Sequence, residues 1–298
     1  MELDIVFHSP PAVSEGMHLL YANSSRATIA ILPEMVVLQA FNPSETASEE
    51  VEIPASSYTM YTRPTQPAVF EFNITKIYQK LKQYANTNRM LRLSFVGNER
   101  IRWTLITPHT LGLKTLAPAR KNAKHKEAKK ELLNQPKKRK KSRTIDESLP
   151  VFELGTSRIT SVDFYELPRP ETIFVGCATI RLPAAEVQAM CSEIAVLGNG
   201  QLRIEAKPDT KQIRFSSVGT RSSISYLFEN RDSSTLDFAV GTEPVSERFS
   251  LQLVFFAQMN LSHIKTVHFT VRPGVGLLMW AIAASGFRYV VNIRQLVH

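Results

Sequence analysis

The sequence predicts an α+β protein made mainly of antiparallel β-sheets. Short runs rich in β-branched and aromatic residues recur along the chain, few segments carry helical periodicity, and both halves follow a similar order of strands and helices. The 298 residues, 43% of them hydrophobic, are enough to bury the cores of two domains. We therefore expect two similar domains in one chain.

The predicted strands share alternating or continuous apolar patterns and are bounded by turn-forming residues. They lie at residues 31–41, 91–95, 102–106, 174–182, 202–206, 212–217, 223–228, 267–271, 277–282 and 289–293. Strands this numerous and this short indicate antiparallel sheets.

The clearest predicted helix spans residues 73–85. Its apolar residues, including Ile77 and Leu81, recur on one face, and Lys76 and Lys80 stand on the opposite face. One side of this helix should pack on a sheet while the lysine side meets solvent.

A second helix is predicted at residues 183–197, because Pro183 suits a first helical turn and Gly198 suits the residue after the last one. Weaker periodicity predicts further helices near 251–261 and 12–21. Each half would then hold two helices, and in both halves an apolar strand end leads into a helix and then an alternating strand.

A basic segment divides the chain. Residues 120–143 hold 12 Lys/Arg and 2 Asp/Glu, although the whole chain has a net charge of only +9. The surrounding stretch has too few large apolar residues to offset the entropy of ordering. We therefore predict a domain at 1–117, a disordered basic insert at 118–148, and a connector with a second domain at 149–298.

The sequence offers little support for secretion, membrane insertion or metal binding. Cys177 and Cys191 show no metal-ligand spacing, and the strongest apolar run, 275–284, is about half the ~20 residues that a membrane span needs. The chain also lacks the Gly-rich phosphate loops, zinc-protease motif and nucleophile elbow typical of common enzyme classes. We expect no cofactor, no membrane association and no catalysis.

Several motifs, in the same order, resemble sliding clamps of the proliferating cell nuclear antigen type. The segments at 35–45, 72–81, 180–187, 213–219 and 287–293 read MVVLQAFNPSE, FNITKIYQKL, IRLPAAEV, IRFSSVG and FRYVVNI. Each motif is degenerate, but together they cover most of the chain outside the basic insert. Glu45 and Asn292 depart from the family pattern, which is typical of a divergent member such as one from a virus or protist.

The resemblance implies a DNA-clamp fold: two similar domains, each with two helices and antiparallel sheets. Three subunits would form a homotrimeric ring whose helices line the hole. Such a ring encircles duplex DNA without reading its bases, is placed there by a clamp loader, and tethers DNA polymerase and other proteins. The expected location is the nucleus, or a viral replication site in an infected cell.

The predicted DNA contacts are cations on or near the helices and in the insert. They are Lys76, Lys80, Lys82, Arg89, Lys265, Lys137, Lys138, Arg139, Lys140 and Lys141. The alternative is that the helix lysines form only a solvated face. The helix at 183–197 presents Glu186 and Glu193 instead of bases, and the helix at 12–21 presents only His18, so the insert could supply missing attraction.

The basic run at 136–143 fits a nuclear localisation signal, a flexible phosphate-binding arm or a plain solvated loop. Its composition alone does not separate the three.

The resemblance also implies a hydrophobic partner pocket beneath the connector, which we place at residues 161–169. Its predicted lining is Phe41, Phe164, Leu167, Tyr289 and Val291. The alternative for Phe41 and Tyr289 is a purely structural place in the core.

Two other functions fit the same sequence. One is a checkpoint-type clamp, in which this chain is one of three different subunits of a ring. The other is a DNA-binding polymerase accessory factor that forms no ring and relies on charge instead of encirclement.

Overall fold

The computed structural model describes residues 3–42, 47–62, 68–84, 88–96, 100–107, 151–158, 177–197, 201–219, 222–229, 235–238, 244–250 and 264–294. Within them the fold is α+β, and every paired strand is antiparallel to its neighbours. This confirms the predicted fold class.

The first half of the chain contains eleven elements of regular structure and one short 3-10 helix. They are β1 (Asp4–Phe7), α1 (Pro10–Asn23), β2 (Arg26–Ile31), β3 (Met35–Phe41), β4 (Ala47–Pro54), η1 (Ala55–Ser57), β5 (Tyr58–Thr62), β6 (Ala68–Asn73), α2 (Ile74–Tyr84), β7 (Met90–Val96), β8 (Arg100–Ile106) and β9 (Val151–Arg158).

The second half follows the same order through its described residues. Its elements are β10 (Ala178–Pro183), α3 (Ala184–Val196), β11 (Gln201–Lys207), β12 (Gln212–Val218), β13 (Ser223–Glu229), β14 (Thr235–Phe238), β15 (Val245–Ser250), β16 (Ile264–Arg272), β17 (Gly276–Ala283) and β18 (Arg288–Arg294). The helix predicted near 251–261 lies outside the described residues.

The strands form three sheets, and the strand orders reveal a duplication. The first sheet has the order β5-β1-β7-β8-β9, and the third has β13-β12-β11-β15. Between them, the long sheet runs β14-β10-β16-β17-β18-β4-β3-β2-β6. Adding nine to every strand number converts the first sheet into β14-β10-β16-β17-β18, and converts β4-β3-β2-β6 into the third sheet. The two halves therefore share one topology.

Among the described strands, one pair joins the two halves. β18 of the second half pairs with β4 of the first, from Arg288 opposite Glu52 to Ile293 opposite Ala47. The nine-stranded sheet runs without interruption through this junction, and its apolar face contributes to one core.

The strand β9 corrects the expected organisation of the chain. It follows the basic segment in sequence, yet it pairs with β8 and completes the first sheet. The boundary that we expected near residue 149 therefore falls between two strands of one sheet. Residues 118–148 belong to the connection between these strands, whereas the equivalent β17–β18 connection is a short turn at residues 284–287.

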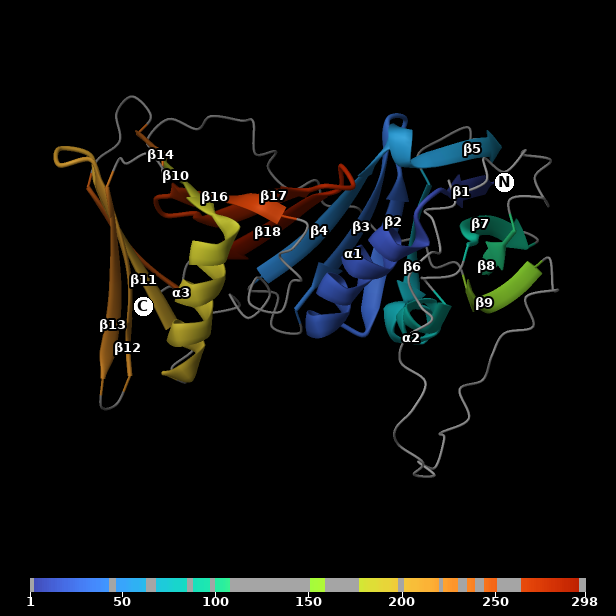
Figure 1. The fold of residues 1–298 in the computed structure, drawn as a ribbon, viewed down its shortest axis with the longest axis horizontal. Coiled ribbons are helices and arrows are strands. Elements are labelled where there is room, and N and C mark those ends of the chain that lie inside the picture. Colours follow the sequence, from blue (N-terminus) through green and yellow to red (C-terminus); the bar gives the residue numbers. More distant parts are fainter. Residues whose placement is uncertain are drawn as a thin grey trace, which may run out of the picture.

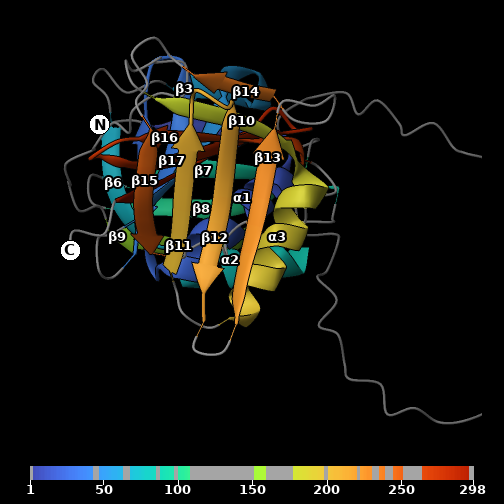
Figure 2. The same ribbon diagram turned by 90° about the vertical axis from the view of Figure 1, so that its left-hand side faces the viewer.

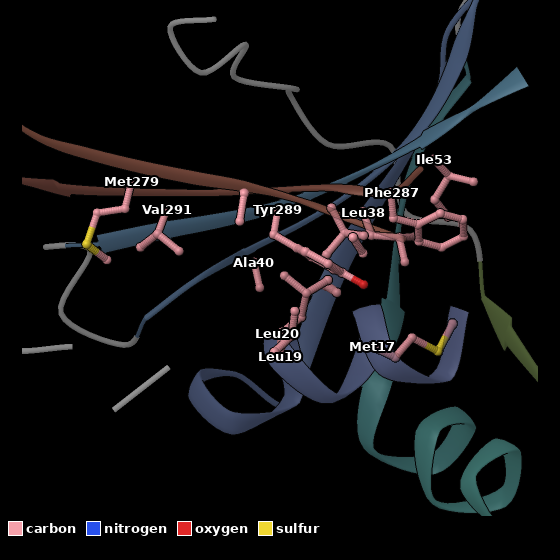
Figure 3. Packing of buried hydrophobic residues seen from close by; sticks show 14 of the residues in the cluster. Met17, Leu19, Leu20, Leu38, Ala40, Ile53, Met279, Phe287, Tyr289 and Val291 are labelled. Carbon is pink, nitrogen blue, oxygen red and sulfur yellow. The ribbon is translucent and has the colours of Figure 1, made fainter. Parts of the chain in front are cut away.

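The helices lie on one side of the long sheet (Figure 1). α1 packs on β3 and β4 and beside α2, which also contacts β9, and α3 packs on β10 and β16. Figure 3 shows Met17, Leu19 and Leu20 of α1 beneath Leu38 and Tyr289 of the sheet. The core thus fills the space between this sheet face and the helices.

Gly16 permits the close approach of α1 to the sheet. A Cβ atom added there would lie 2.9 Å from Cγ1 of Val51 on β4, which is closer than two carbon atoms tolerate. The helix therefore sits against β4 at a distance that a larger residue would increase.

Candidate nucleic-acid and partner surfaces

The helix α2 presents the predicted lysines as the sequence pattern indicated. The Asn73 side-chain oxygen accepts a hydrogen bond from the Lys76 backbone N–H at 3.1 Å and so caps the first turn. Ile74, Ile77, Tyr78 and Leu81 are buried against the sheets, and Lys76, Lys80 and Lys82 are exposed.

Two of these lysines line a hollow of about 470 Å³ between α2 and the edge strand β9. Its lining is Arg26, Glu71, Phe72, Asn73, Lys76, Ile77, Gln79, Lys80, Leu154, Gly155 and Thr156. Arg26 and Glu71 form an ion pair at 3.0 Å on one wall, so the net positive charge of the hollow comes from the lysines. A Cβ on Gly155 would lie 3.2 Å from Ile77, so the glycine lets β9 run close to the helix.

Lys82 lies on the other side of α2, toward α1. Its ammonium group lies 5.8 Å from the centre of the Tyr78 ring, which also stacks on His18 of α1 at 5.4 Å. Burial, and then the charge of Lys82, lower the pKa of His18 below its ordinary value. At neutral pH α1 therefore adds no positive charge here.

The remaining predicted DNA contacts differ in exposure. Lys265, at the start of β16, is exposed. Arg89 is only 7% exposed, so it does not present its guanidinium group to solvent as the prediction requires. Its position just before β7 buries it, an effect that a helical pattern ending at Ala85 does not reveal. Lys137, Lys138, Arg139, Lys140 and Lys141 lie outside the described residues.

The exposed face of α3 is acidic, as the sequence indicated. Glu186 and Glu193 are exposed, and no Lys or Arg occurs in this helix. The Tyr226 hydroxyl on β13 donates a hydrogen bond to the Glu193 carboxylate. Burial, together with this bond, raises the pKa of Tyr226 to about 12, so the hydroxyl remains a donor.

Two of the residues predicted to line the partner pocket lie in the core. Tyr289 and Val291 are both 0% exposed on the helix-facing side of β18 (Figure 3). Burial, with a contribution from Glu15, raises the pKa of the Tyr289 hydroxyl far above its ordinary value. Their part in an accessible pocket is therefore not supported, and the structural alternative holds for Tyr289.

Phe41 is half-buried and lies on the opposite face of the same sheet. Its core-facing neighbour Ala40 fixes this orientation, because successive side chains of a strand alternate between faces. On β18 the residues that share its face are Val290, which is 1% exposed, and Asn292, which is partly exposed. Asn292 is therefore the accessible residue there, and the predicted lining did not include it. Strand alternation could have indicated this, because Tyr289 and Val291 point to the opposite face of the sheet from Val290 and Asn292. Phe164 and Leu167 lie outside the described residues.

Other chemistry finds no site in the part of the chain that the structure describes. No group of three or more His, Cys, Asp or Glu side chains gathers as metal ligands within those residues. None of the described helices has the length and apolarity to span a membrane. Cys177 and Cys191 are buried thiols, and burial raises the pKa of Cys191 to about 12, which keeps it protonated.

Comparison with known proteins adds no family to this picture. A scan against protein-family models found no match, and a search of curated proteins found no similar sequence.

Substitution at Tyr289 tests its assignment to the core. The hydroxyl is buried and has no hydrogen-bond partner among the described residues, so Tyr289→Phe removes a desolvated polar group. We expect the free energy of unfolding in urea to stay equal or rise by about 1 kcal/mol. Tyr289→Ala should lower it by about 3–5 kcal/mol. A stable Tyr289→Ala protein would contradict the assignment.

Proposed function

We propose that this protein is a DNA sliding clamp, a non-enzymatic ring that encircles duplex DNA and tethers a polymerase and other replication proteins. The observation that carries the proposal is the duplication: two halves of one topology are joined by the β18–β4 strand pair. The strands equivalent to this pair in the other two sheets are edge strands, one at each end of the molecule.

The open ends are the strands β9 and β13. They correspond to β18 and β4 under the nine-strand shift, and each is the edge strand of its sheet. They lie at opposite ends of the molecule in Figure 1, and Figure 2 shows β13 beside α3. Repeating the internal junction between copies would pair β9 of one copy with β13 of the next. Such a head-to-tail contact generates a ring if the rotation closes.

The register of the internal junction predicts which residues meet between copies. Arg288 is the first residue of β18, as Val151 is of β9, and they occupy equivalent ladder positions opposite Ile282 and Ile106. Glu52 and Leu227 are also equivalent, since each lies four residues after the start of the β3–β4 or β12–β13 ladder.

The character of these residues supports the pairing. Inside the molecule Arg288 and Glu52 form an ion pair at 3.3 Å. Val151 and Leu227, their counterparts, are 46% and 45% exposed, although both are large apolar residues. Packing them against each other would bury both, which is favourable because it removes apolar surface from water.

The distribution of charge supports weak, sequence-independent binding to DNA. The lysines of α2 lie on the helix layer, where the inner wall of a ring would be, and can meet phosphates without reading bases. The faces of α1 and α3 add no cation among the described residues, so the basic segment in the β8–β9 connection is proposed to contribute attraction. Partners would dock on the opposite sheet face, near Phe41 and Asn292, which are partly exposed.

Loading on DNA tests the function directly. The chain, supplied with a clamp loader or at high concentration, should stay on nicked circular plasmid through a high-salt wash and be lost once the plasmid is linearised. This topological retention is independent of charge. A protein that the salt wash removes equally from circles and linear DNA would instead be a charge-dependent accessory factor.

A cysteine pair tests the register. Val151→Cys with Leu227→Cys should give covalently linked copies under mild oxidation, since residues directly opposite in an antiparallel pair lie about 4.5–5.5 Å apart. The native thiols are buried and should not interfere. The matched control is Val151→Cys with Ser225→Cys, two residues out of register. Equal cross-linking in both variants would contradict the predicted pairing.

Deletion of residues 118–148 tests the basic segment. If it acts as a DNA arm, the deletion should weaken DNA binding and reduce the slope of log affinity against log salt, by about 0.9 for each phosphate that the arm neutralises in the intact chain. An unchanged slope would reject the arm and leave the localisation signal or solvated loop.

A further inference from the structure

Comparison of α1 with α3 shows which helix flank an inter-copy junction would cover. α1 begins at Pro10 and α3 at Ala184, in equivalent places after β1 and β10. Counted from these starts, the buried residues Val13, Met17 and Leu20 correspond to Val187, Cys191 and Ile194, which are also buried. The two helices therefore bury the same stripe against their sheets.

A second stripe differs between the helices. Ala12 and Leu19 of α1 are only 6% and 3% exposed, whereas their counterparts Glu186 and Glu193 are exposed. Figure 3 shows Leu19 beneath Tyr289, a residue that the internal junction brings from the second half. This flank of α1 therefore faces the internal β18–β4 junction, whereas the acidic flank of α3 faces the unpaired edge of β13.

Glu193 is fixed next to the open edge. Its carboxylate accepts the hydrogen bond from Tyr226, and Tyr226 belongs to the edge strand β13. Glu186 lies two turns earlier on the same flank of α3. The acidic pair thus runs along the side of the helix that adjoins β13.

The lysines occupy the matching place at the other open edge. Lys76 and Lys80 line the hollow together with Gly155 and Thr156 of the edge strand β9. Within the described part of the chain, neither lysine nor Glu186 forms an ion pair with an opposite charge. Each open edge therefore carries a row of charge of one sign, and the two signs are opposite.

We infer that the surface of α2 beside β9 docks a second copy of this chain, with Lys76 and Lys80 facing Glu186 and Glu193 of the neighbouring copy. The inference rests on the proposed ring. It adds to the β9–β13 pairing a set of charge contacts, Lys76 and Lys80 with Glu186 and Glu193, which we call the electrostatic key. Opposite charges at the two edges favour head-to-tail contact and oppose contact between like edges.

The lysines of α2 then divide between two roles. Lys76 and Lys80 serve the subunit junction first, and DNA phosphates second, while Lys82 stands on the side toward α1. Exposed ion pairs are screened by salt, so the association of copies should weaken as ionic strength rises.

Charge reversal tests the key. The variants are Glu186→Lys with Glu193→Lys, Lys76→Glu with Lys80→Glu, and all four changes together. Sedimentation of the full-length proteins at low salt should give each double variant a dissociation constant roughly tenfold higher than that of the unaltered chain, because like charges then meet. The fourfold variant should regain most of the assembly, because the opposite signs are restored in exchanged places.

A control pair and the salt dependence complete the test. Glu34→Lys with Lys207→Glu changes exposed charges away from both edges and should leave assembly unchanged. Circular dichroism of every variant checks that the exposed substitutions leave the fold intact. In the unaltered chain the dissociation constant should rise with salt, and in the fourfold variant it should rise similarly.

The outcomes separate the key from the ring itself. If the unaltered chain assembles but neither reversal weakens it, or the fourfold variant stays dissociated, the electrostatic key is wrong and the ring proposal stands. If the unaltered chain is monomeric at every concentration and is not retained on circular DNA, the proposed function fails and the key with it.

Discussion

The backbone ladder between β18 and β4 is the constraint on which the rest of the structure depends. It merges five strands of one half with four of the other into the nine-stranded sheet, and it places Tyr289 of the second half over α1 of the first. A sheet edge is a row of unpaired donors and acceptors that favours further pairing. The same duplication leaves β9 and β13 as edge strands of the described sheets, and the proposed association of copies would pair them.

The internal junction and the proposed junction between copies would use different chemistry on the same backbone pattern. The internal junction is held by the Arg288–Glu52 ion pair on one sheet face and by apolar side chains on the other. At the open edges the apolar residues are Val151 and Leu227, and the charges lie on the helices. A permanent junction can be buried during folding. In the proposed junction between copies, both surfaces would be exposed to water before association, which suits charged helix flanks that stay hydrated until they meet.

The sequence predicted the features that local pattern controls. The apolar stripe of α2 predicted the helix and the exposure of Lys76 and Lys80, and alternation predicted most strands. It did not predict β1, β2, β4, β5, β9 or β14. In β4, for example, the acidic residues do not look like a buried strand, yet the strand pairs with β3 on one side and β18 on the other. The place of β9 beyond the basic segment, and the burial of Arg89, depend on contacts distant in sequence. The prediction placed Tyr289 and Val291 on the wrong face of their strand, which the alternation of side chains along a strand could have corrected.

Imaging the purified full-length chain by electron microscopy tests the central claim most directly, because closure is a question of shape. We expect closed rings of three copies, each of 33.6 kDa, with a central opening wide enough for duplex DNA and the helices on the inner wall. Monomers, or open filaments that continue the head-to-tail contact without closing, would contradict the proposed ring.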